Sequence, residues 1–133
     1  ISAAAILYAL SWAATRAARG VNRGGLQRLA QILLVAAPLL AIGGGGAMCL
    51  SLAGLDPSSH AYPAIMWALA VWTCAHTACG VIMQLYCLAG TFFGKLTSRY
   101  DADLWNSTLY WHFHGGSAII AAGVIGWLPR VLS

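Results

Sequence analysis

The sequence predicts an all-α membrane protein with four transmembrane helices. Of its 133 residues, 60% are hydrophobic and only 8% are charged, whereas a soluble domain carries about 25% charged residues. The apolar residues gather in four segments, near residues 2–18, 26–53, 62–93 and 106–128. A span needs about 20 apolar residues to cross a bilayer core, and these segments reach or approach that length. We expect one transmembrane helical domain, part of a larger chain or complex, because the chain begins inside an apolar run.

Each segment is predicted to be a helix, since none shows the alternation of a strand and backbone groups in lipid must be paired within the segment. In the second segment, Pro38 predicts a kink. The run Gly43–Gly46 removes side chains from a full helical turn. Two interpretations stay open for it: close packing against neighbouring helices, or a hinge or cleft for a lipid tail or a gas molecule.

The distribution of basic residues predicts the orientation. The first loop, residues 16–28, contains four arginines, the second, residues 54–60, has no lysine or arginine, and the third, residues 94–105, contains Lys95 and Arg99. By the positive-inside rule, the first and third loops are cytoplasmic, and both termini of the segment lie outside.

Polar residues mark the predicted helix ends. Residues 56–59 read Asp-Pro-Ser-Ser, which is a turn sequence. Asn106 and Ser107 are the candidate N-caps of the last helix. In the third loop, Asp101 and Asp103 are interpreted as solvated acids rather than as proton collectors.

The four cysteines lie inside apolar segments without a CxxC pair. We therefore interpret them as small buried hydrophobic residues. They are Cys49, Cys74, Cys79 and Cys87.

Three histidines raise the question of a haem or metal site. His76 is expected roughly 25 Å from the cytoplasmic end of its helix and His112 roughly 9 Å, so depth separates them by about 16 Å. His112 and His114 lie two residues apart, which on a helix places them on opposite faces. We therefore expect no redox centre held by this chain alone, and neutral histidines bonded to a neighbouring helix or near the headgroups. All three acidic residues lie in loops, which disfavours ion transport.

Two segments resemble a known family. Tyr110-Trp111-His112-Phe113, opening the last segment, resembles the YWHF signature of cytochrome c oxidase subunit III. The stretch 72–81 resembles the penultimate helix of that family, where His76 matches the first histidine of a Phe-His-Gly-Leu-His pattern and Cys79 replaces the second. The order and orientation of the segments match the last four of the family's seven helices. The chain departs from the pattern at His114, where the family usually has an aspartate.

The resemblance implies an accessory, non-redox subunit of a respiratory cytochrome c oxidase, the proton-pumping haem–copper enzyme of aerobic electron transport. Such a subunit packs on catalytic subunit I and binds phospholipid in the bacterial inner membrane, and some oxidases fuse it to the end of subunit I. It has no active site and no cofactor of its own, because haem and copper belong to partner subunits. The expected partners are subunit I, other respiratory-complex subunits and phospholipids, with no nucleic acid.

On this analogy the arginines of the first loop meet lipid phosphates, and aromatic and histidine side chains join them at the interface. The candidate lipid and interface residues are Arg16, Arg19, Arg23, Arg28, His76, Tyr110, Trp111 and His112. The alternative function is a haem b- or quinone-binding membrane anchor of a respiratory dehydrogenase.

Overall fold

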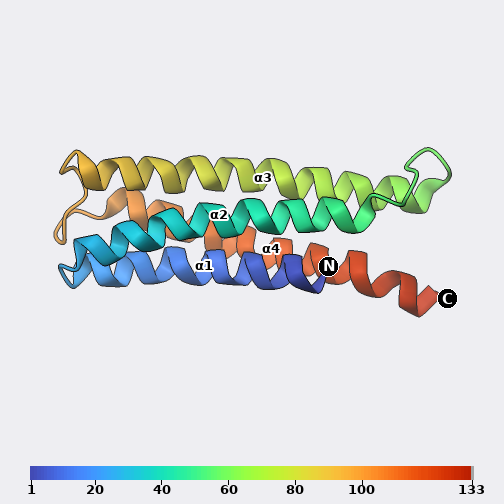
Figure 1. Cartoon of the computed structure of the whole chain (residues 1–133), viewed down its shortest axis with the longest axis horizontal. Helices are drawn as coiled ribbons and strands as arrows, with labels where there is room; N and C mark the ends of the chain where they lie inside the picture. The colour runs from blue at the N-terminus through green and yellow to red at the C-terminus, as the bar shows by residue number, and fades with distance from the viewer. Residues whose placement is uncertain (133) are drawn as a thin grey trace.

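The chain folds into an antiparallel bundle of four long helices (Figure 1). The computed structural model describes the backbone of residues 1–132 and the side chains as far as Trp127. The helices are α1 (Ser2–Arg23), α2 (Gln27–Leu52), α3 (Ala61–Phe92) and α4 (Ala102–Leu132). Both α1 and α3 pack against α2 and α4, so the four helices surround a common interior. The prediction of an all-helical fold is confirmed.

A strict spacing places one face of each helix in the interior. The buried positions of α1 are 4, 8, 11, 15, 18 and 22, and those of α3 include 66, 70, 73, 77, 80, 84, 87 and 91. Alternating steps of four and three residues are typical of helices that pack in a left-handed bundle. The occupants of this face are mostly small or polar, among them Ser11, Thr15, Thr77 and Gln84. Such side chains let the helix backbones approach closely.

The outer surface carries many large apolar side chains. They are exposed on every helix and include Ile6, Ile32, Leu39, Leu50, Ile82, Phe92, Phe113 and Trp127. By length and composition, α2 and α3 are each able to cross a membrane. The assignment of α1 and α4 as spans stays a prediction.

The glycine run of α2 serves two surfaces. The helix continues through Pro38 without interruption. Gly44 faces the ring of Tyr8, where a Cβ atom would lie 3.3 Å from the aromatic carbons. Gly45 and Gly46 instead line a groove of about 450 Å³ between α2 and α3. Of the two interpretations of the glycine run, close helix packing applies to Gly44, and a cleft applies to Gly45 and Gly46.

The first and last loops are shorter than predicted. Because α1 continues to Arg23, the predicted arginine loop of residues 16–28 shrinks to Gly24–Leu26, with Gly25 in the left-handed region at φ 78°. The prediction that Asn106 or Ser107 caps the last helix is wrong. That helix begins at Ala102, and its first turn closes where the Trp105 amide donates to the Asp101 carbonyl at 2.8 Å.

The predicted turn at residues 56–59 is confirmed. The carboxylate of Asp56 accepts hydrogen bonds from the Ser58 amide and hydroxyl at 2.9 and 2.7 Å. These two bonds lower the pKa of Asp56. The turn reverses the chain at the end of the bundle opposite the other two loops (Figure 1).

The cysteines do not share one environment. Cys87 is buried, Cys49 and Cys74 are partly exposed, and Cys79 is exposed. The prediction of four buried cysteines is therefore wrong for Cys79, because its position on α3 falls outside the interior spacing and faces outwards.

Candidate functional site

The two segments that resemble the oxidase family pack against each other. The indole of Trp111 on α4 is fully buried against Gly80 on α3, and its N–H donates to the Gly80 carbonyl at 3.4 Å. The Tyr110 hydroxyl donates to the His76 carbonyl at 2.8 Å. A Cβ on Gly80 would lie 2.9 Å from the Trp111 ring, so any larger residue there would force the ring to shift.

This burial corrects the expected position of Trp111. The side chain was predicted to lie at the headgroup interface, but it is 0% exposed and belongs to the interior. Its neighbour His112 is exposed on another face of α4, where it contacts the Trp12 ring at a centroid distance of 5.5 Å. One residue along a helix turns the side chain by about 100°, which is enough to separate the two environments.

A polar cluster formed by Tyr8, Thr77 and His114 lies next to Trp111. His114 is 1% exposed, and its Nε2 lies 3.0 Å from the Thr77 hydroxyl. The Tyr8 hydroxyl lies 3.0 Å from the same Thr77 oxygen, which in turn donates to the Thr73 carbonyl at 2.9 Å. A hydroxyl has one proton to donate and two lone pairs. With this one proton and two lone pairs, the Thr77 hydroxyl can be the shared hydrogen-bond partner of Tyr8, His114 and the Thr73 carbonyl.

His76 and His114 lie closer together than the depth argument, which compared His76 with His112, led us to expect. Their rings lie 6.1 Å apart between centroids and are nearly parallel, at 23°. The predicted separation failed because it used His112 in place of His114 and began the last helix four residues too late. Each residue of error changes the depth by about 1.5 Å. The prediction that His112 and His114 lie on different faces is confirmed.

Although the two rings are close, each histidine already uses one ring nitrogen in a hydrogen bond. His76 donates from Nδ1 to the Trp72 carbonyl at 3.0 Å, which leaves its Nε2 lone pair free. The Nε2 of His114 is already engaged with the Thr77 hydroxyl at 3.0 Å. Among the described residues, no group of three or more histidine, cysteine or acidic side chains is arranged to hold a metal ion.

Towards the end of the bundle that holds the first and third loops lies a basic pocket of about 420 Å³. It is lined by Arg16, Arg19, Gly20, Arg23, Trp105, Thr108 and His112. Arg16, Arg19 and Arg23 follow one another at steps of three and four on α1, which places them on one helical face. Arg28 belongs to α2 and lines a separate apolar depression beside Ile32 and Leu39, so the predicted group of four arginines divides into three and one.

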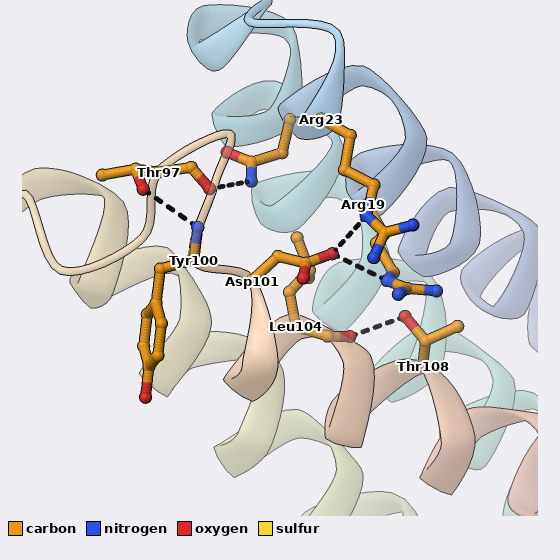
Figure 2. Close-up of polar contacts among 8 residues, drawn as sticks. Arg19, Arg23, Thr97, Tyr100, Asp101, Leu104 and Thr108 are labelled. Carbon is orange, nitrogen blue, oxygen red and sulfur yellow. Dashed lines mark hydrogen bonds and ion pairs between the residues drawn. The ribbon is translucent and has the colours of Figure 1, made fainter.

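Asp101 holds two of these arginines (Figure 2). The Nε atoms of Arg19 and Arg23 both donate to its Oδ2, at 2.9 and 2.8 Å. Arg19 also lies over the Trp105 ring, 3.9 Å from the centroid. Three arginines line the pocket and two of them share one carboxylate, so positive charge is in excess there.

The interpretation of Asp101 as a solvated acid is wrong. Its side chain is 14% exposed and both ion pairs converge on one of its oxygens. Burial acts to raise its pKa, but the hydrogen bonds and charges of Arg23 and Arg19 outweigh burial, and the pKa lies below its ordinary value. Of the four arginines that were expected to meet lipid phosphates, Arg19 and Arg23 therefore pair with a carboxylate of the protein itself.

Comparison with known proteins does not assign a family. No protein-family model matches the chain, and no curated protein matches it.

Tyr8, Thr77 and Gly80 were missed in the sequence, although a signal was present. Residues 73, 77, 80, 84, 87 and 91 are small, polar or cysteine, and they repeat at steps of four and three inside an apolar segment. In a membrane helix such a stripe marks the face that meets other helices. Reading this stripe would have placed Thr77 and Gly80 in the interior.

Proposed function

We propose that this chain is an accessory, non-redox subunit of a respiratory haem–copper oxidase, corresponding to the last four helices of cytochrome c oxidase subunit III. In this role it spans the bacterial inner membrane four times, packs on the catalytic subunit and binds phospholipid. Haem and copper stay with the partner subunits.

The observation that carries this proposal is the contact between the two resembling segments. A short motif such as Tyr110-Trp111-His112-Phe113 arises easily by chance. Here its tryptophan and tyrosine pack on Gly80 and on the His76 carbonyl, within the second resembling segment. Two independent sequence resemblances that meet in one interface support a shared fold more strongly than either does alone.

The placement of polar side chains inside the bundle and large apolar side chains outside it supports the membrane location. Polar side chains such as Gln84 and Thr15 bond to each other inside, at 2.8 Å, while isoleucine, leucine and phenylalanine cover the outside. In water this distribution would expose a large apolar area, whereas in lipid the apolar side chains meet hydrocarbon and many of the polar groups bond to one another inside. The first and third loops lie at one end, where Asn22 donates to the Thr97 carbonyl. The basic residues of these loops favour the cytoplasmic side.

The basic pocket supports phospholipid binding. Its excess positive charge sits at the end of an apolar bundle, beside Trp105, where a lipid phosphate would lie. An anionic headgroup is thus attracted by Arg16, whose guanidinium has no part in the Asp101 ion pairs.

Co-purification tests the proposed function. The tagged chain is expressed in its native host, extracted in mild detergent and purified, and the eluate is examined for copper and for the visible spectrum of a haem–copper oxidase. We expect a partner polypeptide that carries both. A chain that purifies alone, stable and without haem or copper partners, contradicts the proposal.

The same spectrum tests the alternative, a haem b- or quinone-binding anchor. The observation that favours the alternative is the 6.1 Å approach of the His76 and His114 rings. A b-type Soret band in the isolated chain, lost in His76→Ala, would establish it. The hydrogen bond that engages His114 Nε2 with Thr77 argues for the accessory role.

Lipid binding is tested with matched arginine variants. Arg16→Gln removes a charge from the pocket, whereas Arg28→Gln removes the same charge from outside it. Near an anionic surface each arginine contributes about 1 kcal/mol. We expect Arg16→Gln to weaken retention of phosphatidylglycerol about fivefold in native mass spectrometry, and Arg28→Gln to leave it unchanged. Equal effects of the two variants would show that lipid retention depends on overall surface charge and would contradict a specific lipid site in the pocket.

A further inference from the structure

The groove between α2 and α3 brings two cysteines into contact. The Sγ atoms of Cys49 and Cys74 lie 3.7 Å apart, although 25 positions separate them in the chain. The two thiols approach from different helices, so their contact depends on the packing of α2 on α3 and not on local sequence.

The cysteine pair lies beside Gly45, which has no side chain, and opens onto the groove between α2 and α3. Cys74 Sγ lies 3.9 Å from the Gly45 carbonyl, and a Cβ on Gly45 would lie 3.4 Å from that sulfur. Both cysteines are partly exposed and line the groove of about 450 Å³ together with Gly46, Ile42 and Ile82. A small uncharged molecule thus has access to both sulfur atoms from the outer surface of the bundle.

The other two cysteines are placed differently. Cys79 is exposed and Cys87 is buried, and in the described part of the chain neither makes a sulfur–sulfur contact. Cys49 and Cys74 are therefore distinguished from them by geometry, which gives the experiment two internal controls.

We propose that Cys49 and Cys74 form a reversible disulfide that ties α2 to α3, and that the oxidant is a small uncharged peroxide entering by the groove. One thiol sulfur attacks a peroxide oxygen, the O–O bond breaks, and a sulfenic acid and one water result. The second thiol then attacks the sulfenic sulfur, the S–O bond breaks, and the hydroxyl leaves as a second water with the thiol proton. The two sulfurs lose two electrons together, and hydrogen peroxide is reduced to two waters.

The disulfide has a mechanical consequence for the bundle. It joins helices at the mouth of the groove and closes the segment between residues 49 and 74 into a covalent loop. Closing a loop of this size restricts the unfolded chain and stabilises the folded one. Oxidation thus couples the redox state of the surroundings to the rigidity of α2 on α3. The inference does not depend on the proposed oxidase role, because it rests on this chain alone.

Thiol mapping tests the proposal on the full chain in detergent or native membranes. The protein is treated with hydrogen peroxide, the remaining thiols are blocked with iodoacetamide under denaturing conditions, and the peptides are examined by mass spectrometry without reduction. We expect a linked peptide pair containing Cys49 and Cys74, free thiols at Cys79 and Cys87, and full reversal by dithiothreitol. The thermal midpoint of the oxidised protein should rise.

Four single variants make the test specific. Cys49→Ala and Cys74→Ala should each abolish the intramolecular link and the shift of the thermal midpoint, whereas Cys79→Ala and Cys87→Ala should preserve both. Recovery of all four thiols in alkylated form would overturn the proposal. A link that includes Cys79 or Cys87, or that joins two copies of the chain, would equally overturn it. Alanine is smaller than cysteine and introduces no clash at any of the four positions. The folding of each variant is checked by size-exclusion chromatography before oxidation.

Discussion

Two polar regions of this bundle contain hydrogen bonds of similar length and different consequence. Around Thr77, bonds of 3.0 Å join Tyr8 and His114 deep between the helices. Around Asp101, bonds of 2.8 and 2.9 Å join two arginines at the end of the bundle, one of them 56% exposed. Water competes for the groups of the second region and cannot reach those of the first.

The comparison teaches that burial, rather than charge, decides how much a polar contact stabilises this molecule. The neutral cluster has no alternative partners when one member is removed, whereas the arginines turn to solvent. We therefore expect the effects of substitution to fall steadily from the interior to the basic pocket. Four predictions test that order in the purified protein in detergent.

Trp111→Ala should have the largest effect. The side chain is fully buried between α3 and α4, and its removal leaves a cavity that costs about 3 to 5 kcal/mol of unfolding free energy. Denaturant titration measures the loss. Trp127, which is 67% exposed, is the control, and Trp127→Ala should change the unfolding free energy little. Similar effects of the two variants would contradict the interior placement of the motif.

Gly80→Ala should be the next most destabilising change. The added methyl would lie 2.9 Å from the Trp111 ring, and overpacking of this kind costs about 1 to 3 kcal/mol. Gly46→Ala places the same methyl group where no atom lies within 4 Å, and alanine is the better helix former. We expect thermal unfolding to shift down for the first variant and to stay level or rise for the second.

Thr77→Val should cost about 1 to 2 kcal/mol, because it removes the shared partner of Tyr8 and His114 while keeping the shape of the side chain. Thr73→Val is the matched control, since the Thr73 hydroxyl donates to the Leu69 carbonyl of its own helix. Loss of the shared partner should also change the nitrogen chemical shift of His114 Nε2 by NMR in Thr77→Val. An unchanged shift would count against the hydrogen bond between His114 and Thr77.

Asp101→Asn should have the smallest effect, about 1 kcal/mol, because Arg23 is 56% exposed and both arginines lie at the end of the bundle, where they can turn to solvent. The pKa of Asp101 is depressed in the folded protein, so its contribution is present above the unfolded value of about 3.9 and is lost as the pH falls through the folded value. Unfolding measured from pH 6 down to pH 3 should therefore be less pH-dependent in Asp101→Asn than in the wild type. Asp103→Asn is the control, since Asp103 forms no ion pair in the described part of the chain.

The sequence was sufficient for the number and type of elements but not for their ends. Long apolar runs and the turn at Asp56 set the four helices in order. The last helix was predicted four residues late because Asn106 is a good capping residue in isolation, whereas the chain begins the helix where Asp101 meets Arg19 and Arg23. Asp101 directly precedes that helix, and aspartate is itself a favoured residue at a helix N-terminus.

Site prediction met the same limit. The four arginines were grouped as one basic feature. That Arg16, Arg19 and Arg23 share a face of α1 while Arg28 belongs to α2 became visible only once the end of α1 at Arg23 was known. Similarly, His114 was predicted to bond to a neighbouring helix, and it does so, but its partner Thr77 lies 37 positions away. No local pattern relates such distant residues.

What the sequence by itself determined is the helical class, the apolar exterior and the concentration of positive charge toward one end of the bundle, because these follow from composition and order along the chain. What only the tertiary structure decided is the register between helices. Register places His114 beside His76, Trp111 over Gly80 and Cys49 against Cys74. Its physical basis is steric: Gly80 and Gly44 have no side chain, and the helices settle where Trp111 and Tyr8 fill the space that these glycines leave.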